Sequence, residues 1–426
     1  MSKNKNRSIW VLITGMIINK IHTLLRIHKA LKGVSFDRKT LMDFQHLKLL
    51  DILQYANRHI PFYRDRFREN NIDIPDDMHA DDVEQILRQI PVLQRDQLIG
   101  LPINDIISTE CAFKGLLSEK TSGSSGKRLF VYTTKKDFLW KNTIRMRSLL
   151  LSGYKPYWKR LDCGTYYGRT NNPAGNFMML RKRVIHATQD ICDAVSTIED
   201  FKPHCLTGFP RYLQQVGRQL RKKPRKIKLL ITLGEMLDAA SREDLEQMFN
   251  CPVRNHYGAV ELGRLAFEDY TTSEMYLNED NYYFELNESN ELLVTAFNLH
   301  AMPLIRYNLR DVVELEEPDD KYPFRRIRSI LGRSDDFIVS RSGLMISPYS
   351  LGAIISTCSG VKQYQVIQMM RGKIVINIVR NGELDTNSLT ESLNNQKLNI
   401  DYSVNITDRI RRGPSGKYKA IINKIA

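Results

Sequence analysis

Closely spaced cysteines are missing from this chain of 426 residues, although it contains six cysteines. They lie far apart and form no CxxC pair, a spacing that argues against a disulfide framework and against a cysteine zinc site. We therefore expect reduced thiols, as in cytoplasmic proteins. Low-complexity tracts and internal repeats are missing too, which argues against solenoid and propeller architectures. With 42% hydrophobic residues, the chain can bury a large core and is long enough for two or three domains.

A hydrophobic run long enough to cross a bilayer is missing from the beginning of the chain. The apolar run from Ile9 to Ile18 is too short to span the hydrocarbon core, and no small-residue cleavage site follows it. This segment fits either a packed surface helix or an interfacial helix whose Lys3, Lys5 and Arg7 meet lipid headgroups. We expect a cytoplasmic protein, with peripheral membrane contact as the alternative left open.

Acidic residues are outnumbered, 48 against 63 basic residues, which gives a formal net charge of +15. This balance favours an anionic partner, such as a nucleotide, a coenzyme, an acidic glycan, a membrane surface or nucleic acid. The basic residues are scattered, apart from a cluster over residues 218–228. Because no recognition helix, zinc finger or RNA-binding signature is present, we expect no nucleic-acid partner.

The hydrophobic periodicity changes along the chain. A helical pattern covers residues 41–71, and strand-like and helical stretches then alternate up to residue 258, as in an α/β domain with largely parallel strands. Short strands at hairpin spacing follow over residues 275–314, and a strand–strand–helix–strand pattern ends the chain. We expect an α/β fold. Residues 1–334 would form a large N-terminal α/β domain with a β-rich subdomain, and residues 335–426 a small C-terminal α+β domain.

The stretch TSGSSGK, from Thr121 to Lys127, is rich in glycine and hydroxyl side chains. It is not a Walker motif, which needs a glycine five residues before its last glycine and a serine or threonine after its lysine. Thr121 and Arg128 stand in those two positions. A Rossmann GxGxxG and the GxSxG elbow of α/β hydrolases are absent as well.

The same loop nevertheless has the groups needed to hold a polyphosphate. Gly123 and Gly126 allow positive φ angles and a close approach of backbone N–H groups. The hydroxyl donors are Thr121, Ser122, Ser124 and Ser125, and Lys127 adds a positive charge. On the loop alone, a phosphate cradle and an ordinary Ser/Gly surface turn are equally good interpretations.

Further motifs occur in a fixed order along the chain. They are LLDILQYANRHIPFYRDRF, IPVLQRDQL, TSGSSGK, LITLGEML with Gly234 and Glu235, NHYGAVE from Asn255 to Glu261, RYNLRD ending in Asp311, LGRSDD with Arg333 and Asp335, and GPSGK ending in Lys417. In this order the chain resembles the adenylate-forming superfamily, specifically its phenylacetate–coenzyme A ligase-like branch, which includes capsular-polysaccharide biosynthesis members. The resemblance covers nearly the whole chain.

The resemblance implies a role for each of these residues. The phosphate-binding loop would be Thr121 to Lys127; the adenine and ribose site Gly234, Glu235, Tyr257, Gly258, Asp311 and Arg333; the magnesium ligand Glu261; the hinge Asp335; and the catalytic lysine Lys417, with Glu261 as its catalytic partner. The small C-terminal domain would be mobile, because its rotation about Asp335 would bring Lys417 into the site for the first step and remove it for the second.

Each residue type suits its implied role and also has a plainer interpretation. Tyr257 can stack on a purine or be a core tyrosine, and Glu261 can bind magnesium or form a salt bridge. Asp311 can accept from two ribose hydroxyls or occupy a turn. Arg333 can bind a phosphate or ribose oxygen or form a surface ion pair. Lys417 can steady the charge that develops at the α-phosphate or belong to a solvated basic tail. Their common order favours the functional interpretation.

The chemistry that the resemblance implies has two steps. A carboxylate attacks the α-phosphate of ATP, with magnesium, to give an acyl-adenylate and pyrophosphate, and an acceptor then displaces AMP. The acceptor stays open between an amine or hydroxyl of a surface-polysaccharide precursor and the thiol of coenzyme A. The segment FIVSRSGLMISP lacks the arginine–glycine pair and the asparagine that the family commonly has there. A non-catalytic nucleotide-binding scaffold is the alternative from another class.

The carboxylic acid itself is not identified by the sequence. The aromatic segments CGTYYGRTNN and HCLTGFPRY lie next to the motifs and are the predicted borders of the acyl pocket. Within them, the predicted pocket residues are Tyr166, Tyr167, Gly208 and Phe209.

Overall fold

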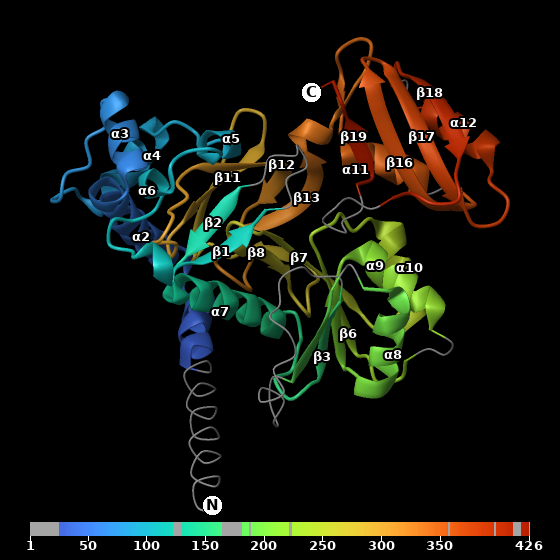
Figure 1. Cartoon of the computed structure of the whole chain (residues 1–426), viewed down its shortest axis with the longest axis horizontal. Coiled ribbons are helices and arrows are strands. Elements are labelled where there is room, and N and C mark those ends of the chain that lie inside the picture. Colours follow the sequence, from blue (N-terminus) through green and yellow to red (C-terminus); the bar gives the residue numbers. More distant parts are fainter. Residues whose placement is uncertain are drawn as a thin grey trace, which may run out of the picture.

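The computed structural model describes residues 25–121, 129–163, 181–186, 189–220, 224–356, 358–395, 398–411 and 419–425. Its central feature is an eleven-stranded mixed sheet with the strand order β10-β11-β12-β13-β9-β8-β7-β6-β5-β3-β4 (Figure 1). A separate four-stranded sheet, near the C-terminus of the chain, lies beside one end of it (Figure 1).

The parallel half of the large sheet contains the alternating segments predicted from the sequence. Its strands are β3 (Arg160–Cys163), β4 (Lys182–Ile185), β5 (Cys205–Gly208), β6 (Leu229–Leu233) and β7 (Val253–Ala259). The helices α8 (Ile191–Phe201), α9 (Pro210–Gln219) and α10 (Ala239–Phe249) pack on these strands through a shared apolar core that includes Leu206, Leu213, Leu230 and Leu245. Asp190 and Asp238 cap the N-termini of α8 and α10 by accepting backbone N–H bonds.

The antiparallel half continues the same sheet, because β7 pairs with β8 in antiparallel register. It contains β8 (Gly263–Glu268), β9 (Met275–Leu277), β10 (Tyr282–Leu286), β11 (Glu291–Ala296), β12 (Tyr307–Glu316) and β13 (Arg326–Arg333). The α/β fold class predicted from the sequence is confirmed, and the β-rich part is hydrogen-bonded into the same sheet as the parallel strands.

Short and long helices near the beginning of the described chain cover this antiparallel half. They are η1 (Lys32–Ser35), α2 (Arg38–His59), α3 (Pro61–Glu69), η2 (Ala80–Asp82), α4 (Val83–Gln89), α5 (Arg95–Leu98), α6 (Ile103–Ile106) and η3 (Phe113–Gly115). Pro61 separates α2 from α3 and stands at the first turn of α3. Leu53 and Phe67 from these helices share one apolar core with Val294 and Ile305.

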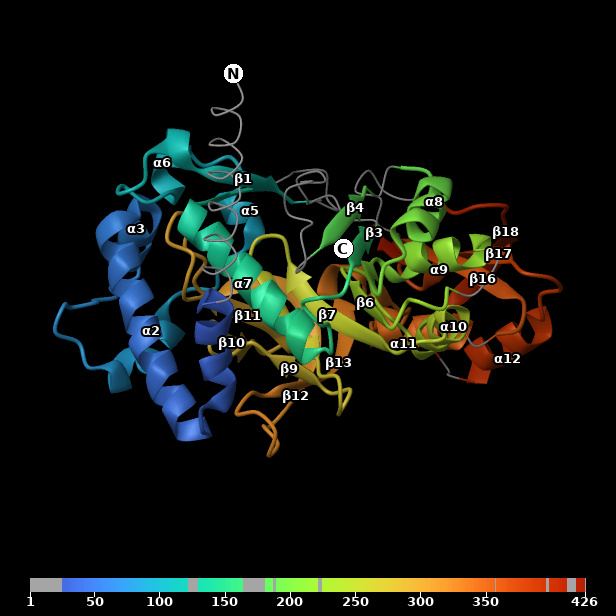
Figure 2. The same ribbon diagram turned by 90° about the horizontal axis from the view of Figure 1, so that it is seen from below.

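A β-hairpin and a long helix precede the parallel strands. The strands β1 (Leu117–Lys120) and β2 (Phe130–Thr133) pair in antiparallel fashion on either side of the serine/glycine segment. Helix α7 (Lys135–Leu151) begins with a capping box between Thr134 and Asp137. It packs against β8 and lies across the large sheet in Figure 2.

The C-terminal module contains β14 (Ile338–Val339), β15 (Met345–Ile346), α11 (Pro348–Ser356), β16 (Val361–Met370), β17 (Lys373–Arg380), α12 (Thr386–Asn395), β18 (Asp401–Ile406) and β19 (Ile421–Asn423), and η5 (Ser334–Asp336) leads into it. Its sheet has the order β18-β17-β16-β19 and its own core, which includes Leu351, Val366, Ile376 and Leu389. The strand–strand–helix–strand pattern predicted for this region is confirmed. The domain boundary between residues 334 and 335 stays a prediction.

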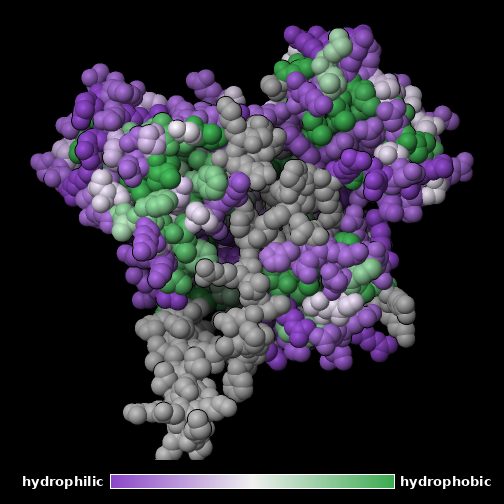
Figure 3. All heavy atoms as spheres, viewed as in Figure 1, coloured by the Kyte–Doolittle hydropathy of each residue, from purple (hydrophilic) through white to green (hydrophobic). Residues whose placement is uncertain are grey.

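In Figure 3, polar side chains cover most of the coloured surface, with smaller apolar patches over the N-terminal helices and over the C-terminal module. Within the described ranges, no helix combines the length and apolar character needed to cross a membrane. The N-terminal segment that we expect to be a surface or interfacial helix, residues 1–24, lies outside the described residues.

Candidate active site

A cavity of about 1930 Å³ opens beside the carboxyl ends of β5, β6 and β7. Thr207, Leu233 and Tyr257 line it from these three strands, and α7 and β8 contribute further side chains. Pro348 and Lys419 line it from the C-terminal module. The cavity therefore lies between the large sheet and the C-terminal module, at the strand ends where open α/β sheets commonly bind ligands.

One end of this cavity, which we name the tyrosine–aspartate end, is built by Tyr257, Glu261, Asp311 and Arg333. The Tyr257 hydroxyl donates a hydrogen bond of 2.5 Å to Asp311 Oδ2. Asp311 lies opposite Arg333 in the register of β12 and β13. Burial, together with the charge of Asp311, raises the pKa of Tyr257 well above its usual value. An aromatic ring, a carboxylate and a guanidinium therefore meet at one place, and their role as an adenine and ribose site stays a prediction.

Glu261 lies at the same end, directly after β7, and is 9% exposed. Its Oε1 accepts a hydrogen bond of 3.3 Å from the Tyr307 hydroxyl. The described part of the chain contains no group of three His, Cys, Asp or Glu residues that could hold a metal ion. Magnesium is commonly held by one or two carboxylates together with substrate phosphates and waters, and Glu261 fits that kind of site.

Glycines shape the backbone around this end. Gly234 has a φ of 74° in the turn after β6, and Glu235 beside it lines the cavity. Gly258 lines the cavity at a bulge between β7 and β8, where an added Cβ would lie 2.2 Å from the carbonyl oxygen of Gly263. Both positions therefore require glycine.

The predicted hinge residue, Asp335, borders the cavity. Its Oδ1 accepts a hydrogen bond of 2.9 Å from Arg310 Nη1, and its Oδ2 lies 3.6 Å from Arg333 Nη2. The next residue, Asp336, forms an ion pair of 2.7 Å with Lys419 of the C-terminal module. Charged contacts therefore join the two sides of the cavity at this point.

The structure brings together part of the predicted acyl pocket and phosphate loop. Phe209 lines the cavity, whereas Gly208 does not and instead lies so close to Cys163 that an added Cβ would be 2.4 Å from its carbonyl oxygen. Thr121 lines the cavity, and its hydroxyl accepts a hydrogen bond of 3.1 Å from the backbone N–H of Leu129. The predicted residues Ser122, Gly123, Ser124, Ser125, Gly126, Lys127, Tyr166, Tyr167 and Lys417 lie outside the described residues.

The other end of the cavity, which we name the arginine end, was not predicted from the sequence. It is built by Arg145 on α7, Arg160 and Asp162 on β3, Lys182 on β4 and Arg264 on β8. Asp162 Oδ1 accepts hydrogen bonds from Arg160 Nε at 2.8 Å and from the Thr207 hydroxyl at 2.7 Å. Although burial opposes it, the charges of Arg160, Lys182 and Arg145 hold the pKa of the Asp162 carboxyl below its usual range.

His256 lies between the two ends, on β7, and is 1% exposed. The Ser152 hydroxyl donates to the carbonyl oxygen of Glu268 at 2.6 Å, so His256 Nε2, 2.8 Å from Ser152 Oγ, must be the donor of that second bond. Burial, with the nearby Arg264 charge, lowers the pKa of His256 well below its usual value. The ring is therefore neutral, with Nδ1 as an acceptor.

A signal for the arginine end is present in the sequence. The stretch RLDC becomes a strand that is buried at every position, and it carries an arginine and an aspartate two residues apart. Residues two apart on a strand share a face, so Arg160 and Asp162 had to face the same buried surroundings. Charged side chains inside a buried strand are rare unless they are paired or functional, and this rule could have identified the site.

Known proteins resemble this chain over most of its length. The pattern of the CapK C-terminal domain family matches residues 338–424. Protein CapK from Staphylococcus aureus is 24% identical over 448 residues, covering 98% of this chain and 97% of that protein. A phenylacetate-coenzyme A ligase from Pseudomonas putida is 24% identical over 368 residues, covering 78% of this chain and 77% of the ligase.

The fold agrees with solved structures as well. A crystal structure of 2-hydroxyisobutyryl-CoA ligase in the postadenylation state, in complex with R3-HIB-AMP, superposes with a TM-score of 0.73 at 16% identity and covers 89% of each chain. The fold, the two sequence relatives and the C-terminal match agree with the motif order found in the sequence. Together these findings support the adenylate-forming superfamily, in the branch that contains CapK and the phenylacetate–coenzyme A ligases, as the group that this chain resembles.

Proposed function

We propose that this protein is an ATP-dependent ligase that activates a carboxylic acid as an acyl-adenylate and passes the acyl group to an acceptor. The observation that carries the proposal is the tyrosine–aspartate end of the cavity. There, Tyr257, Asp311 and Glu261 stand together at the strand ends, in the order that the superfamily's motifs give them. Tyr257 suits a purine, Asp311 a ribose and Glu261 a metal–phosphate group.

In the first step, a carboxylate oxygen of the acid attacks the α-phosphorus of ATP, and the bond to the β-phosphate oxygen breaks, releasing pyrophosphate. Tyr257 packs on the adenine beside Gly234 and Glu235, and Asp311 accepts hydrogen bonds from the ribose, while Arg333 binds a phosphate or ribose oxygen. Residues 121–127 hold the β- and γ-phosphates. Glu261 would hold a magnesium ion, which would supply positive charge against the phosphate oxygens. Lys417 stabilises the charge that develops on the α-phosphate.

In the second step, an acceptor attacks the acyl carbonyl and AMP leaves. We favour an amine or hydroxyl of a surface-polysaccharide precursor, because the motif order resembles the branch that includes capsular-polysaccharide biosynthesis members and because the net charge of +15 suits an anionic glycan. The thiol of coenzyme A is the second candidate, favoured by the activity for which the phenylacetate-coenzyme A ligase relative is named. Peripheral membrane contact through residues 1–24 would place the protein near lipid-linked precursors and stays a prediction.

We also propose that residues 1–334 and 335–426 are separate domains that move about Asp335. The cavity is lined from both sides of this point, so a rotation would exchange the side chains that close it. The contacts of Asp335 with Arg310 and of Asp336 with Lys419 are partly exposed charged contacts that such a rotation could break at little cost. Lys417 would leave the cavity in the rotated state.

The experiment that tests the proposal is a screen for pyrophosphate release by the full-length protein with MgATP. Aryl, fatty, amino and uronic acids are supplied in turn, with and without coenzyme A, and the products are identified by mass spectrometry. We expect release that depends on at least one acid and yields AMP. ATP binding without acid-dependent release from any acid of the panel would favour the non-catalytic scaffold instead.

A further inference from the structure

The arginine end of the cavity contains a buried guanidinium whose Nε has no hydrogen-bond partner in the part of the chain that the structure describes. Arg264 is 8% exposed and lines the cavity, and its Nε has no hydrogen-bond partner among the described residues. The Nε of Arg145, on the neighbouring helix α7, is likewise buried without a partner in the described part of the chain. Burying a charged group without a partner costs several kcal/mol, so such an arrangement needs an explanation.

Another buried arginine on the same helix shows how this fold treats a structural guanidinium. Arg147 is 0% exposed and donates to the carbonyl oxygen of Ala30 at 2.8 Å, to Asn278 Oδ1 at 2.6 Å and to both oxygens of Asp280. Its position two residues after Arg145 turns it away from the cavity, which it does not line. The arginine used for packing is saturated with acceptors, whereas the two that face the cavity are not.

The charges around the arginine end are unbalanced. Arg145, Arg160, Lys182 and Arg264 all feel the charge of Asp162, and this one carboxylate is already bound by Arg160 and by the Thr207 hydroxyl. Burial, reinforced by Arg145, lowers the pKa of Arg264 to about 9, which still leaves the guanidinium charged at neutral pH. Nearby Lys141 adds no excess charge, because it pairs with Glu119 at 2.5 Å.

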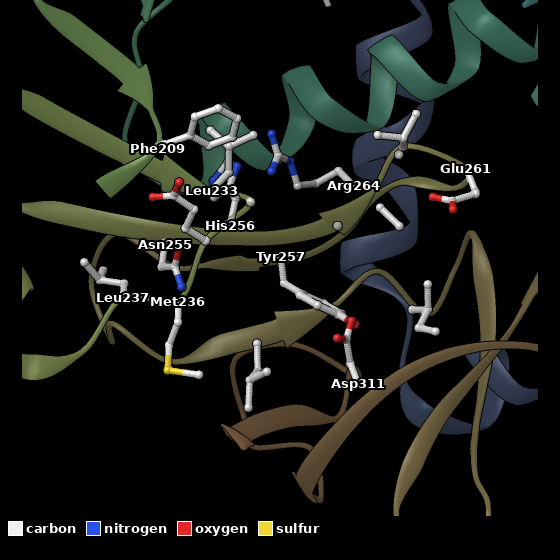
Figure 4. A pocket seen from close by; sticks show the side chains of 18 of the residues that line it. Phe209, Leu233, Met236, Leu237, Asn255, His256, Tyr257, Glu261, Arg264 and Asp311 are labelled. Atoms are coloured by element: carbon white, nitrogen blue, oxygen red, sulfur yellow. The ribbon is translucent and has the colours of Figure 1, made fainter. Parts of the chain in front are cut away.

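Tyr257 stands between Arg264, at the arginine end of the cavity, and Asp311, at the tyrosine–aspartate end (Figure 4). In Figure 4, Arg264 lies on the side of Tyr257 that faces α7, and Asp311 lies on the opposite side. Phe209 and His256 are next to Arg264 in the same view, and Glu261 is farther along. An acid whose reacting carboxylate meets the α-phosphate at the tyrosine–aspartate end would therefore extend its other end toward Arg264.

We propose that the arginine end binds a second anionic group of the acyl substrate, so that the protein activates acids that carry a second carboxylate or a comparable anion. This inference rests on the proposed function. A carboxylate can accept paired hydrogen bonds from a guanidinium, and it would supply the buried acceptors that Arg264 and Arg145 lack. His256 Nδ1, a neutral acceptor beside the same space, would suit a hydroxyl of that substrate.

The test compares dicarboxylic acids with their own monomethyl esters, which have nearly the same shape and lack the second charge. Acid-dependent pyrophosphate release is measured for a series of chain lengths with the full-length protein. We expect kcat/KM for the best dicarboxylic acid to exceed that of its monomethyl ester by 10-fold or more, since a buried hydrogen-bonded ion pair contributes at least ~1.4 kcal/mol, a factor of ten. Equal values for every pair would overturn the inference.

A variant then assigns the effect to the arginine end. In Arg264→Met, we expect kcat/KM for the dicarboxylic acid to fall to the level of the monomethyl ester, while the value for the ester changes less than threefold. Arg68→Met, at an arginine whose side chain is 74% exposed, is the matched control and should keep the preference. A loss that is equal for both substrates would assign Arg264 to another task and contradict the proposal.

Thermal unfolding separates binding from structure. Replacing an unpaired buried guanidinium by an apolar side chain of similar length removes a desolvation cost, so Arg264→Met should melt at the same temperature as the natural chain or higher. A large decrease in Tm would mean that Arg264 has a structural partner, and would count against the proposal. Arg145→Met then serves as the second variant in the kinetic comparison.

Two further outcomes remain distinguishable. If no acid of any kind releases pyrophosphate from the natural chain, the proposed function itself fails. If monocarboxylic acids are activated and a second anion gives no advantage, the function stands and only the inference fails. The alternative is that the arginine end binds a phosphate group. In that case inorganic pyrophosphate inhibits the natural chain, Arg264→Met abolishes this inhibition, and the variant keeps the preference for dicarboxylic acids. That result would overturn the proposal of a second anionic group on the acid.

Discussion

Individual side chains at the tyrosine–aspartate end are held in place by hydrogen bonds within the protein. The bond of 2.5 Å between Tyr257 and Asp311 fixes both the ring and the carboxylate, and the Tyr307 hydroxyl orients Glu261. Such preorganisation lowers the cost of ordering these groups when ATP binds. The sequence motifs named these residues, but only the fold places them at one cavity end.

Glu261 is where magnesium dependence should originate. In Glu261→Gln, we expect the magnesium concentration that gives half-maximal pyrophosphate release to rise about tenfold, because a neutral amide is a weaker ligand for a hard cation. A magnesium titration at saturating acid measures this. If the titration curves of the variant and the natural chain coincide, Glu261 does not hold the metal.

Lys417 should act on the adenylation step rather than on nucleotide binding. In Lys417→Ala, we expect acid-dependent pyrophosphate release to fall about 10²–10³-fold, as when one group that stabilises developing charge is removed from an enzyme. The affinity for ATP, measured by calorimetry, should change little. Unchanged pyrophosphate release would remove Lys417 from the mechanism, whereas a matching loss of ATP affinity would make it a binding residue.

The site residues that could not be predicted from the sequence are those whose role depends on neighbours far away in the chain. Arg145 and Arg147 are two residues apart on α7. Arg147 donates hydrogen bonds to Asp280, whereas Arg145 faces the cavity, and the residues around them in the sequence do not predict this difference. That difference arises only from the packing of α7 against β8 and from residues more than a hundred positions away. Motif order carries no such information.

At the scale of secondary-structure elements, the antiparallel pairing of β7 and β8 positions the Tyr257 side chain. The backbones approach closely at the bulge beside Tyr257, and a Cβ on Gly258 would lie 2.2 Å from the carbonyl oxygen of Gly263. The strands must therefore separate if any other residue replaces this glycine. Their separation would move the Tyr257 ring relative to Asp311.

Gly258→Ala tests this dependence. We expect a loss of about 1–3 kcal/mol in the free energy of unfolding, as for overpacked sites, together with a higher KM for ATP. Urea denaturation and steady-state kinetics measure the two quantities. Gly115→Ala is the control, since an added Cβ there meets nothing within 4 Å. Equal behaviour of the two variants would show that the close approach does not position Tyr257.

Local patterns predicted many elements correctly because each is set by nearby residues. The alternating strands and helices of the parallel half and the strand–strand–helix–strand pattern of the C-terminal module follow from hydrophobic periodicity. The joining of the parallel and antiparallel strands into one sheet could not be predicted this way. In that sheet β13 lies between β12 and β9, a pairing between segments far apart in the chain.

At the scale of the whole molecule, the large sheet and the C-terminal module line the cavity from two sides. The large sheet provides the tyrosine–aspartate end and the arginine end, and the C-terminal module adds Lys419 and its pair with Asp336. In the proposed function, the nucleotide would lie at the tyrosine–aspartate end, the acid would extend toward the arginine end, and the C-terminal module would close the cavity. Transfer of the acyl group through an adenylate is therefore the central claim for the molecule as a whole.

The most direct test of that claim follows an oxygen atom. A carboxylic acid that is a substrate in the pyrophosphate-release screen is labelled with ¹⁸O in its carboxyl group, and the AMP formed is analysed by mass spectrometry. If the carboxylate attacks the α-phosphorus, one labelled oxygen must remain in AMP when the acceptor takes the acyl group. We predict one ¹⁸O per AMP from fully labelled acid. AMP without label would contradict the account. So would AMP that carries ¹⁸O when unlabelled acid reacts in ¹⁸O-labelled water.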